Sequence, residues 1–228
     1  MKKNLTLLIP VKKEKESLGI FLKKLNKYDL KKLLVVDKND KIQYQKLIKK
    51  SKNIKIYISR KTGYGNALIE GINQIDTKYF CIINADGSMN PNEINKMMKL
   101  TKNNSFIFGS RYIKNGGSED DTLITYVGNK FFSIIGNIFF KLKISDILYT
   151  YVIGETKLAK NLKLKSGDFK ICVELPIKVE QFNYNYIDFP CYELKRIGGK
   201  KKVNAFKDGF LILAKMLELF FKRIFNNE

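Results

Sequence analysis

The chain has 228 residues, 44% of them hydrophobic, which is enough for the core of one large folded domain. Its 43 Lys and Arg against 22 Asp and Glu give a formal net charge of +21, which indicates an anionic partner (nucleic acid, a lipid surface or a phosphorylated ligand) unless it reflects composition bias alone. No histidine is present, which excludes catalysis by an imidazole base, including serine-type triads and most zinc hydrolases.

The first residues, MKKNLTLLIPVKK, contain an apolar run of six residues, which is too short for a signal peptide. The three cysteines, Cys81, Cys172 and Cys191, are widely spaced and form neither a disulfide framework nor a zinc-site pattern. Both observations favour a reducing compartment, and we therefore expect a cytoplasmic protein.

Five short apolar runs in the first half of the chain predict β-strands. They cover residues 5–10, 33–37, 54–59, 79–84 and 105–110. Helical spacing between them is clear over residues 18–25 and 94–98, and weaker over residues 41–50 and 66–75. This alternation predicts an α/β fold with a mostly parallel central sheet and helices on both faces.

Unusual polar residues follow each predicted strand. They are Pro10 to Glu14, Asp37, Arg60 to Gly65, Asn84 to Asp86, and Ser110 with Arg111. Ligands of open α/β sheets bind beyond the carboxyl ends of the strands. Each segment alone is consistent with a solvated loop, but five in succession predict one site.

The stretch Asn84-Ala85-Asp86-Gly87 places a single carboxylate at the end of an apolar strand. Such a carboxylate suits Mg²⁺ or Mn²⁺ held between the protein and a diphosphate, because these ions prefer oxygen ligands and use only one or two carboxylates. The alternative is a structural turn at the start of a helix, capped by Asp86 or Asn90 with Pro91 in the first turn.

A Gly-Tyr-Gly sequence at Gly63 to Gly65 leads from a predicted strand into a predicted helix. Free backbone N–H groups in such a loop can face an anion. The spacing matches neither the dinucleotide-binding motif nor a Walker loop. A tight turn with close helix packing explains the two glycines equally well.

The second half contains a polar loop (115–122), an apolar segment interrupted by lysines (130–144), a helix (169–181), a strand (183–191) and a basic loop (195–202). No apolar run reaches the roughly 20 residues that span a bilayer. Residues 205–228 predict an amphipathic helix with lysines opposite one apolar stripe, formed by Phe206, Phe210, Leu213, Ala214, Leu217, Phe220, Phe221 and Ile224.

The order of these motifs resembles that of the family-2 inverting glycosyltransferases. LLIPVKKEKESL resembles their opening IPxYNExxxL, and LLVVDKND resembles their IVVDDGSxD. GYGNALIEGI and YFCIINADGSMNPNEI resemble their Gly-x-Gly-x-Ala helix and Asp-x-Asp strand end. FGSRYIKNGG and KRIGGKKK are similar to the branch that glycosylates dolichyl or polyprenyl phosphate, so the resemblance covers about residues 5–205.

The resemblance implies a GT-A domain over residues 1–204, with a nucleotide-sugar-binding half (1–111) and an acceptor-binding half (112–204). It implies a donor site built from Pro10, Val11, Glu14, Asp37, Gly63, Gly65, Asn84, Ala85 and Asp86. Asp86 and Asn84 would hold the divalent cation, Mg²⁺ or Mn²⁺. The acceptor phosphate would meet Arg111, Arg196, Lys200 and Lys202, and the catalytic residues would be Asp86, Arg111 and Arg196.

Three departures from the family pattern affect these expectations. Asn84 stands at the first Asp of Asp-x-Asp, which removes one negative charge, although its carbonyl oxygen can still accept a hydrogen bond or coordinate. Lys12 and Lys13 replace Tyr-Asn, and Lys38 replaces an Asp, so the nucleobase stays undetermined.

We predict metal-dependent, inverting transfer of a sugar from a nucleotide to a polyprenyl phosphate. This acceptor needs no general base, because the second pKa of a phosphate monoester is about 6. A hydroxyl acceptor on a glycan or lipid is the alternative, with its base drawn from Asp168, Glu174 or the segment Glu119 to Asp121. An inactive glycosyltransferase-like binding protein is a further alternative.

A basic nucleic-acid-binding module is the alternative from another class. The carboxylates Asp37 and Asp86 at the strand ends disfavour it, because they would repel a phosphate backbone. The sequence also contains no helix-turn-helix, RRM or zinc-finger pattern. We therefore expect no nucleic-acid partner.

Two apolar segments, near 131–144 and 206–225, carry lysines among their apolar residues. Amphipathic helices of this composition lie in the interface of anionic membranes. They predict a peripheral protein at the cytoplasmic membrane face. Packing on the sheet, against a second copy of the chain or against a membrane-protein partner is the alternative.

Overall fold

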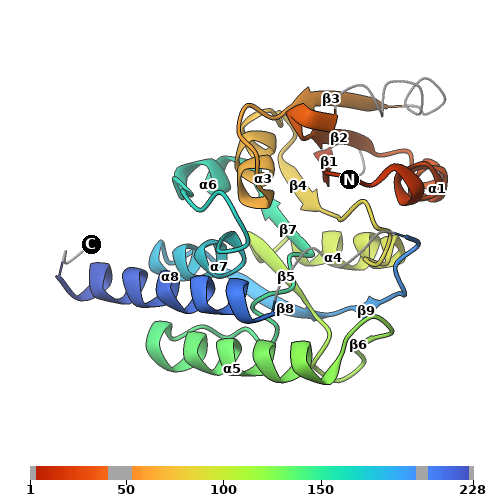
Figure 1. The fold of residues 1–228 in the computed structure, drawn as a ribbon. Coiled ribbons are helices and arrows are strands. Elements are labelled where there is room, and N and C mark those ends of the chain that lie inside the picture. The colour runs from red at the N-terminus through yellow and green to blue at the C-terminus, as the bar shows by residue number, and fades with distance from the viewer. Residues whose placement is uncertain (1–3, 41–52, 199–204, 226–228) are drawn as a thin grey trace.

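The computed structural model describes residues 4–40, 53–198 and 205–225, and it confirms the predicted α/β fold class (Figure 1). The central sheet has seven strands in the order β3-β2-β1-β4-β7-β5-β8. β7 runs antiparallel to β4 and β5, and the other adjacent strands are parallel. The strands are β1 (Leu5–Val11), β2 (Lys31–Val36), β3 (Ile54–Ile58), β4 (Tyr79–Ile82), β5 (Phe106–Ser110), β7 (Val152–Glu155) and β8 (Tyr186–Pro190).

Helices cover both faces of this sheet. On one face lie α1 (Lys15–Leu25) and α4 (Ile94–Leu100). The other face carries α3 (Tyr64–Asn73), α5 (Leu123–Phe140), α6 (Thr156–Asn161), α7 (Ile171–Gln181) and α8 (Ala205–Phe225). Short 3₁₀ turns complete the chain: η2 (Asn26–Tyr28), η3 (Lys38–Asp40) and η4 (Pro91–Glu93).

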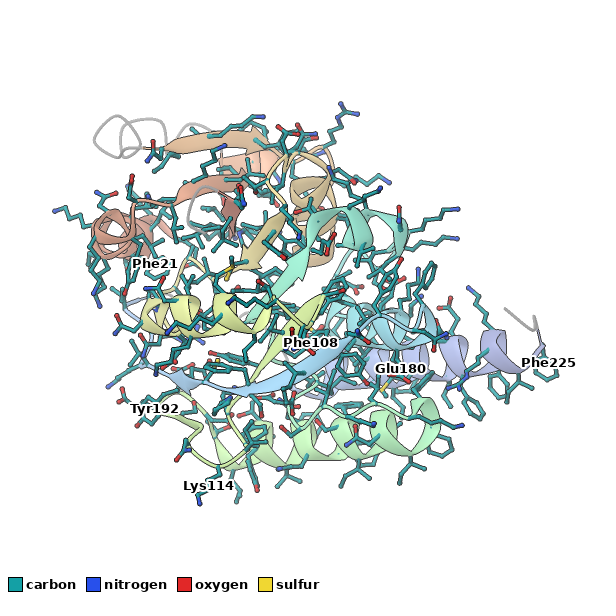
Figure 2. All side chains as sticks on the ribbon, turned by 180° about the vertical axis from the view of Figure 1, so that it is seen from behind. Phe21, Phe108, Lys114, Glu180, Tyr192 and Phe225 are labelled. Atoms are coloured by element: carbon teal, nitrogen blue, oxygen red, sulfur yellow. The ribbon has the colours of Figure 1, made fainter. Side chains whose placement is uncertain are left out.

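Strand β1 shows why the central strands are apolar throughout. Leu7 packs in the cluster beneath α1 and α4, whereas its neighbour Leu8 packs in the cluster beneath α3 and α7. Side chains alternate across a strand, so a sheet covered on both faces requires apolar residues at nearly every position. Figure 2 shows Phe21 and Phe108 within these layers, whereas Phe225 lies at the free end of α8.

The polar loop predicted at residues 115–122 contains a strand. β6 (Gly117–Ser118) pairs with β9 (Tyr192–Glu193), and the backbone N–H of Glu119 donates to the carbonyl of Glu193. β6, β9 and the four-residue β7 were not predicted, because such short segments show too few residues for a periodic pattern. The helix predicted at residues 41–50 lies outside the described residues.

Helix α5 corrects the boundaries of the segment predicted at 130–144. It begins after Thr122, whose hydroxyl accepts from the backbone N–H of Thr125, and ends at Lys141 in a left-handed conformation. By length and composition alone, its 18 residues would suffice to cross a membrane. The search for uninterrupted apolar runs missed this, because polar residues such as Asn129 and Ser133 divide the helix.

Helix α8 is apolar on two sides. Ile212, Met216 and Leu219 are buried against the rest of the protein, and Phe220 contacts Phe139 of α5 at 5.4 Å between ring centroids. Most of the predicted stripe faces outward instead: Phe206, Phe210, Ala214, Leu217, Phe221 and Ile224 are exposed. The side opposite the stripe is therefore a packing face, on which Lys215 is buried beside Ile212, Met216 and Leu219.

Candidate active site

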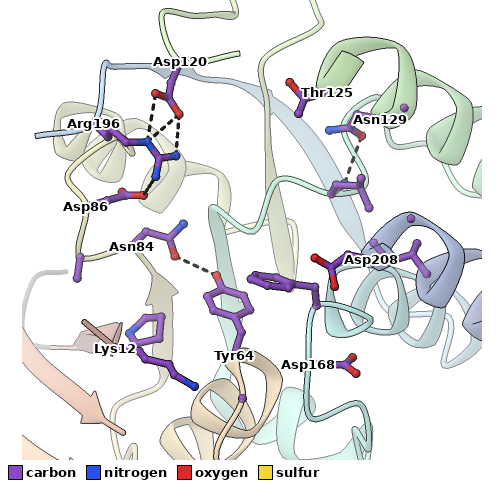
Figure 3. A pocket seen from close by; sticks show the side chains of 18 of the residues that line it. Lys12, Tyr64, Asn84, Asp86, Asp120, Thr125, Asn129, Asp168, Arg196 and Asp208 are labelled. Carbon is purple, nitrogen blue, oxygen red and sulfur yellow. Dashed lines mark hydrogen bonds and ion pairs between the residues drawn. The ribbon is translucent and has the colours of Figure 1, made fainter. Parts of the chain in front are cut away.

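A cavity of about 1150 Å³ lies at the carboxyl ends of β1, β2 and β4 and extends to α5 and α8 (Figure 3). Polar segments from four of the five predicted strand ends, together with Arg111 after the fifth, line it. At the far end the wall is mainly apolar and comes from the two helices: Leu123, Ile124, Val127, Phe132, Phe206 and Ile212. The structure therefore brings the strand-end residues into one site.

At the ends of β1 and β2, two buried carboxylates are held by hydrogen bonds and an ion pair. Asp37 is buried, its Oδ1 accepts from the backbone N–H of Asn39 at 3.1 Å, and its Oδ2 lies 3.3 Å from Lys12 Nζ. Glu14 is also buried and accepts from Ser17 Oγ at 2.8 Å. Both carboxylates are fixed in place, and Lys12 partly neutralises Asp37.

The stretch after β4 serves two purposes. Asn84, Ala85 and Asp86 line the cavity, whereas Asn90 accepts from the backbone N–H of Asn92 and Pro91 begins η4. The structural alternative therefore holds for Asn90 and Pro91 only. Gly87 between the two parts has φ +76°, and a Cβ there would lie 2.4 Å from Ile197, so glycine is required.

Asp86 directs one carboxylate oxygen toward the guanidinium of Arg196. Its Oδ1 accepts from the backbone N–H and the hydroxyl of Ser88, at 3.1 and 3.0 Å. Its Oδ2 lies 3.8 Å from Arg196 Nη1. The Ser88 bonds orient the carboxylate, and the remaining oxygen faces the guanidinium.

Arg196 lies between two carboxylates (Figure 3). Its Nε donates to both oxygens of Asp120 at 3.2 Å, and its Nη2 donates to Asp120 Oδ2 at 2.7 Å. The hydrogen bond to Asp120, against the effect of burial and with help from Asp86, raises the pKa of Arg196. The guanidinium is therefore held more tightly by Asp120 than by Asp86.

Arg111 is more deeply enclosed. All three of its side-chain nitrogen atoms donate to carboxylates: Nε and Nη2 to Asp146 at 2.7 and 3.0 Å, and Nη1 to Glu193 at 3.0 Å. Burial alone would lower the pKa of Arg111, but Asp146 and Glu193 raise it above its ordinary value. Asn129 of α5 also donates to Asp146. The arrangement ties β5, β9 and α5 together at the cavity wall.

The two glycines of the Gly-Tyr-Gly sequence face a neighbouring loop. A Cβ at Gly65 would lie 2.0 Å from the carbonyl oxygen of Ser166, and one at Gly63 would lie 2.2 Å from that of Gly167. The next backbone N–H, of Asn66, donates to Gly167. Close backbone packing thus accounts for both glycines, and only Gly63 also lines the cavity.

A model of the family described as glycosyl transferase family 2 matches residues 6–162, more than half of the chain. The chain belongs to this family. The match includes the cavity-lining ends of β1, β2 and β4 and the Gly-Tyr-Gly sequence.

Solved structures with a similar fold agree with this assignment. Mannosyl-3-phosphoglycerate synthase from Rubrobacter xylanophilus aligns with a TM-score of 0.73 and 12% identity, over 97% of this chain and 75% of that one. Glucosyl-3-phosphoglycerate synthase from Mycobacterium tuberculosis, in complex with Mn²⁺, UDP and glucosyl-3-phosphoglycerate, aligns with a TM-score of 0.69 and 8% identity, over 95% of this chain and 79% of that one. At such identities the likeness shows the GT-A fold alone.

Most residues expected to bind the donor of this glycosyl transferase line the cavity: Pro10, Val11, Glu14, Asp37, Gly63, Asn84, Ala85 and Asp86. Gly65 lies behind it, against the Ser166 loop. Arg111 and Arg196 also line it, whereas Lys200 and Lys202 lie outside the described residues. The individual roles of these residues stay predictions.

Several cavity-lining residues were not identified from the sequence. Tyr64 stacks on Phe169 with ring centroids 5.2 Å apart, and both line the cavity. Asp208, in the first turns of α8, also lines it (Figure 3). Tyr64 was visible between the two glycines, but Phe169 and Asp208 lie in segments interpreted as ordinary helices, and no local signal marks them.

Proposed function

We propose that this family-2 glycosyl transferase moves a sugar, with inversion, from a nucleoside diphosphate sugar to a polyprenyl phosphate at the cytoplasmic face of a membrane. One observation carries the proposal: a single cavity runs from Asp86 and Arg196 to the apolar wall of α5 and α8. It offers polar contacts for a nucleotide sugar at one end and apolar contacts for a lipid at the other.

The residues present fit a divalent cation bound mainly by the donor. Within residues 4–40, 53–198 and 205–225, no three candidate ligand side chains form a cluster that would hold a metal by itself. Mg²⁺ and Mn²⁺ commonly use one or two carboxylates together with phosphate oxygens and water. Asp86, oriented by Ser88, supplies one such carboxylate.

A cation at Asp86 would neutralise charge that develops on the diphosphate leaving group. The Mycobacterium tuberculosis enzyme, crystallised with Mn²⁺ and UDP, supports this cofactor for the shared fold. The carbonyl oxygen of Asn84 accepts from Tyr64 at 3.0 Å, which leaves its second lone pair for the cation.

The acceptor side needs a cation but no general base. A phosphate monoester is largely dianionic at neutral pH, so an oxygen of the acceptor can attack the anomeric carbon directly as the bond to the diphosphate breaks. Arg196 is placed to orient that phosphate, whereas Arg111 is engaged by two buried carboxylates. The two proteins of similar fold named above are a mannosyl- and a glucosyl-3-phosphoglycerate synthase, so their products also carry a phosphate.

Exposed apolar side chains favour a lipid acceptor over a water-soluble one. We call them the α5–α8 face: Leu123, Ile124, Val127, Phe131, Ile134 and Ile138 of α5, with Phe206, Phe210, Leu217, Phe221 and Ile224 of α8. The two helices lie side by side, because Phe132 approaches Gly209 and Phe139 contacts Phe220 (Figure 1). Lys207 and Lys222 are exposed on α8, and Lys near apolar surface favours anionic membranes.

A hydroxyl acceptor is the second candidate, and one observation favours it. Of the carboxylates considered as its base, Asp168 lines the cavity and is 47% exposed. Glu174 is buried against the backbone of Lys165 and Ser166, and Glu119 accepts from the backbone of Lys195 outside the cavity lining. Asp120 and Asp121 also line the cavity, but Asp120 is bound by Arg196, and Asp121 accepts hydrogen bonds from the hydroxyls of Tyr112 and Thr125. Of these carboxylates, we therefore favour Asp168 as the base for a hydroxyl acceptor.

The proposal is tested with the full-length protein, in two steps. Thermal stabilisation by UDP or GDP that requires Mn²⁺ would establish the donor site, because ligands that bind the folded state raise its apparent stability. Transfer is then assayed with a panel of UDP and GDP sugars and three acceptors: a polyprenyl phosphate, the matching polyprenol, and 3-phosphoglycerate.

Glycosylation of the polyprenyl phosphate but not of the polyprenol is the expected result. Transfer to 3-phosphoglycerate alone would contradict a lipid acceptor. Transfer to the polyprenol, abolished in Asp168→Asn, would favour the hydroxyl alternative. Absence of stabilisation by both nucleotides, with and without Mn²⁺, would instead indicate an inactive relative.

A further inference from the structure

The sequence offered Asp120 only as one of several candidate bases in the segment Glu119 to Asp121, yet it makes the shortest contacts of the Arg196 side chain. Three hydrogen bonds of 2.7 to 3.2 Å join them, whereas Arg196 Nη1 lies 3.8 Å from Asp86 Oδ2. Asp120 comes from the segment between β6 and α5, on the opposite side of the guanidinium from Asp86 (Figure 3). The guanidinium is therefore drawn away from Asp86.

A hydrogen bond to its backbone fixes the position of Asp120. Its backbone N–H donates to Ser118 Oγ at 3.1 Å, and that hydroxyl donates to Glu193 Oε2 at 2.6 Å. Glu193 is in turn bound by Arg111. Asp120 is thus anchored to the buried network at the cavity wall and does not depend on substrate for its placement.

The charges at this point have a consequence for cation binding. Asp86 and Asp120 carry two negative charges around the single positive charge of Arg196. Without the charge on Asp120, the charges of Asp86 and Arg196 would cancel, and the guanidinium would be free to close on Asp86 Oδ2. A guanidinium in hydrogen-bond contact with that oxygen competes with a divalent cation for it.

We propose that Asp120 is a positioning residue that holds Arg196 off Asp86. This leaves Asp86 Oδ2 for the divalent cation and turns the guanidinium toward the substrate phosphate. The inference rests on the proposed function, since it concerns the same donor site. A purely structural role, in which Asp120 only ties the β6–α5 segment to residue 196, is the competing explanation.

The test is the Mn²⁺ dependence of nucleotide stabilisation in the full-length protein. UDP or GDP, whichever stabilises the wild type, is held at saturation while Mn²⁺ is titrated, and the midpoint of the thermal shift is recorded. Asp120→Asn should raise this midpoint about tenfold or more, because the released guanidinium of Arg196 would bind Asp86 Oδ2 and compete with the divalent ion for it. Asp120→Glu should restore it to within about threefold of the wild type.

Two controls separate the proposal from simpler effects. Glu119→Gln removes the neighbouring charge of the same segment without touching Arg196, and it should shift the midpoint by less than about threefold. In an Arg196→Gln background, Asp120→Asn should also have little effect, because Asp120 acts through the guanidinium. Asp120→Ser is a second neutral variant should the amide variant fail to fold.

The inference is overturned if Asp120→Asn lowers thermal stability without moving the Mn²⁺ midpoint, as a structural role requires. An equal shift in the presence and absence of Arg196 would also overturn it, since the effect would then be one of charge alone. If the wild type shows no Mn²⁺-dependent stabilisation by either nucleotide, the proposed donor site itself is contradicted. That result is distinct from an unchanged midpoint in the variant.

Discussion

Tyr64 donates its phenolic hydrogen to Asn84 Oδ1 at 3.0 Å, and the same hydroxyl lies 2.6 Å from Thr150 Oγ1. Burial raises the pKa of Tyr64, so the phenol stays protonated at neutral pH. Because its one hydrogen goes to Asn84, Thr150 is the donor in the second bond. The amide that replaces the first acidic residue of the family motif is therefore held by a buried hydroxyl pair.

This relationship predicts the effect of restoring the acidic residue. Asn84→Asp keeps an acceptor for Tyr64 and adds a negative charge at the end of β4, two residues from Asp86. The Mn²⁺ concentration needed for nucleotide stabilisation should fall about tenfold. The measurement is the Mn²⁺ titration of the thermal shift, with Asn84→Ala as the control that removes the acceptor without adding charge. An unchanged midpoint in Asn84→Asp would place the cation away from Asn84.

Arg111 should matter for folding more than for acceptor binding. Arg111→Gln leaves Asp146 and Glu193 without their cation in a buried setting, which typically costs about 3–5 kcal/mol. Arg196→Gln, at a more exposed ion pair, should cost about 1 kcal/mol or less. Urea denaturation of both variants provides the free energies of unfolding. An Arg111→Gln protein of wild-type stability that no longer transfers sugar would support the direct role expected from the sequence.

The sequence was sufficient for the strands of the central sheet other than β7, and for much of the donor side of the cavity. β1, β2 and β4 are apolar throughout, and the residues that follow them are polar, so periodicity and strand-end rules place Pro10, Asp37 and Asp86 together. Order along the chain is enough there, because parallel strands bring their ends to one edge. The remaining contacts depend on packing between distant segments.

Asp120, Asp146 and Asp208 show what the sequence did not reveal. Asp120 meets Arg196, which lies 76 positions away, through the short pairing of β6 with β9. Asp146 is buried beneath Arg111, and Asp208 reaches the cavity only because the inner side of α8 packs on α5 and α7. In the sequence Asp146 and Asp208 are two acidic residues among many, and Asp120 is one of several candidate bases with no sign of its contact with Arg196. Long-range packing, with no local pattern, selects them.

Glu174 predicts a specific dependence of stability on pH. Burial acts to raise the pKa of Glu174, but bonds from the Ser166 backbone and the Lys178 ammonium outweigh it and lower the pKa below the usual value of 4.5. A depressed carboxyl pKa contributes stability that is present above the unfolded value and is lost as pH falls through the folded one. Glu174→Gln should therefore cost about 1–3 kcal/mol at pH 7.

The difference between wild type and Glu174→Gln should shrink as pH falls below about 4. Urea denaturation at several pH values measures it. Glu180→Gln, on the same helix, is the matched control, since a neutral amide oxygen there can still accept from Tyr186. A difference that stays constant down to pH 3 would show that Glu174 contributes through packing and not through its charge.

The α5–α8 face predicts binding to anionic vesicles. Phe210 and Phe221 are 71% and 51% exposed on the outer side of α8, and burying such a side chain contributes about 1.5–3 kcal/mol. Replacing both with Ser should weaken flotation with anionic vesicles at least about tenfold. The fold should survive, because Ile212, Met216 and Leu219 on the inner side are unchanged. Ile20→Ser, at an exposed site on α1 across the sheet, is the control and should float like the wild type.

Three outcomes of the flotation assay would be informative. Equal binding of the wild type and the double variant, lost at high salt, would assign the attraction to the lysines alone, since exposed charges are screened by salt. Negligible binding by the wild type would contradict a peripheral membrane protein. In that case a second copy of the chain would bury the exposed apolar side chains, because an exposed apolar face of this kind can equally bind another protein. Light scattering should then show that the wild type is a dimer. The double variant with Phe210→Ser and Phe221→Ser should be a monomer.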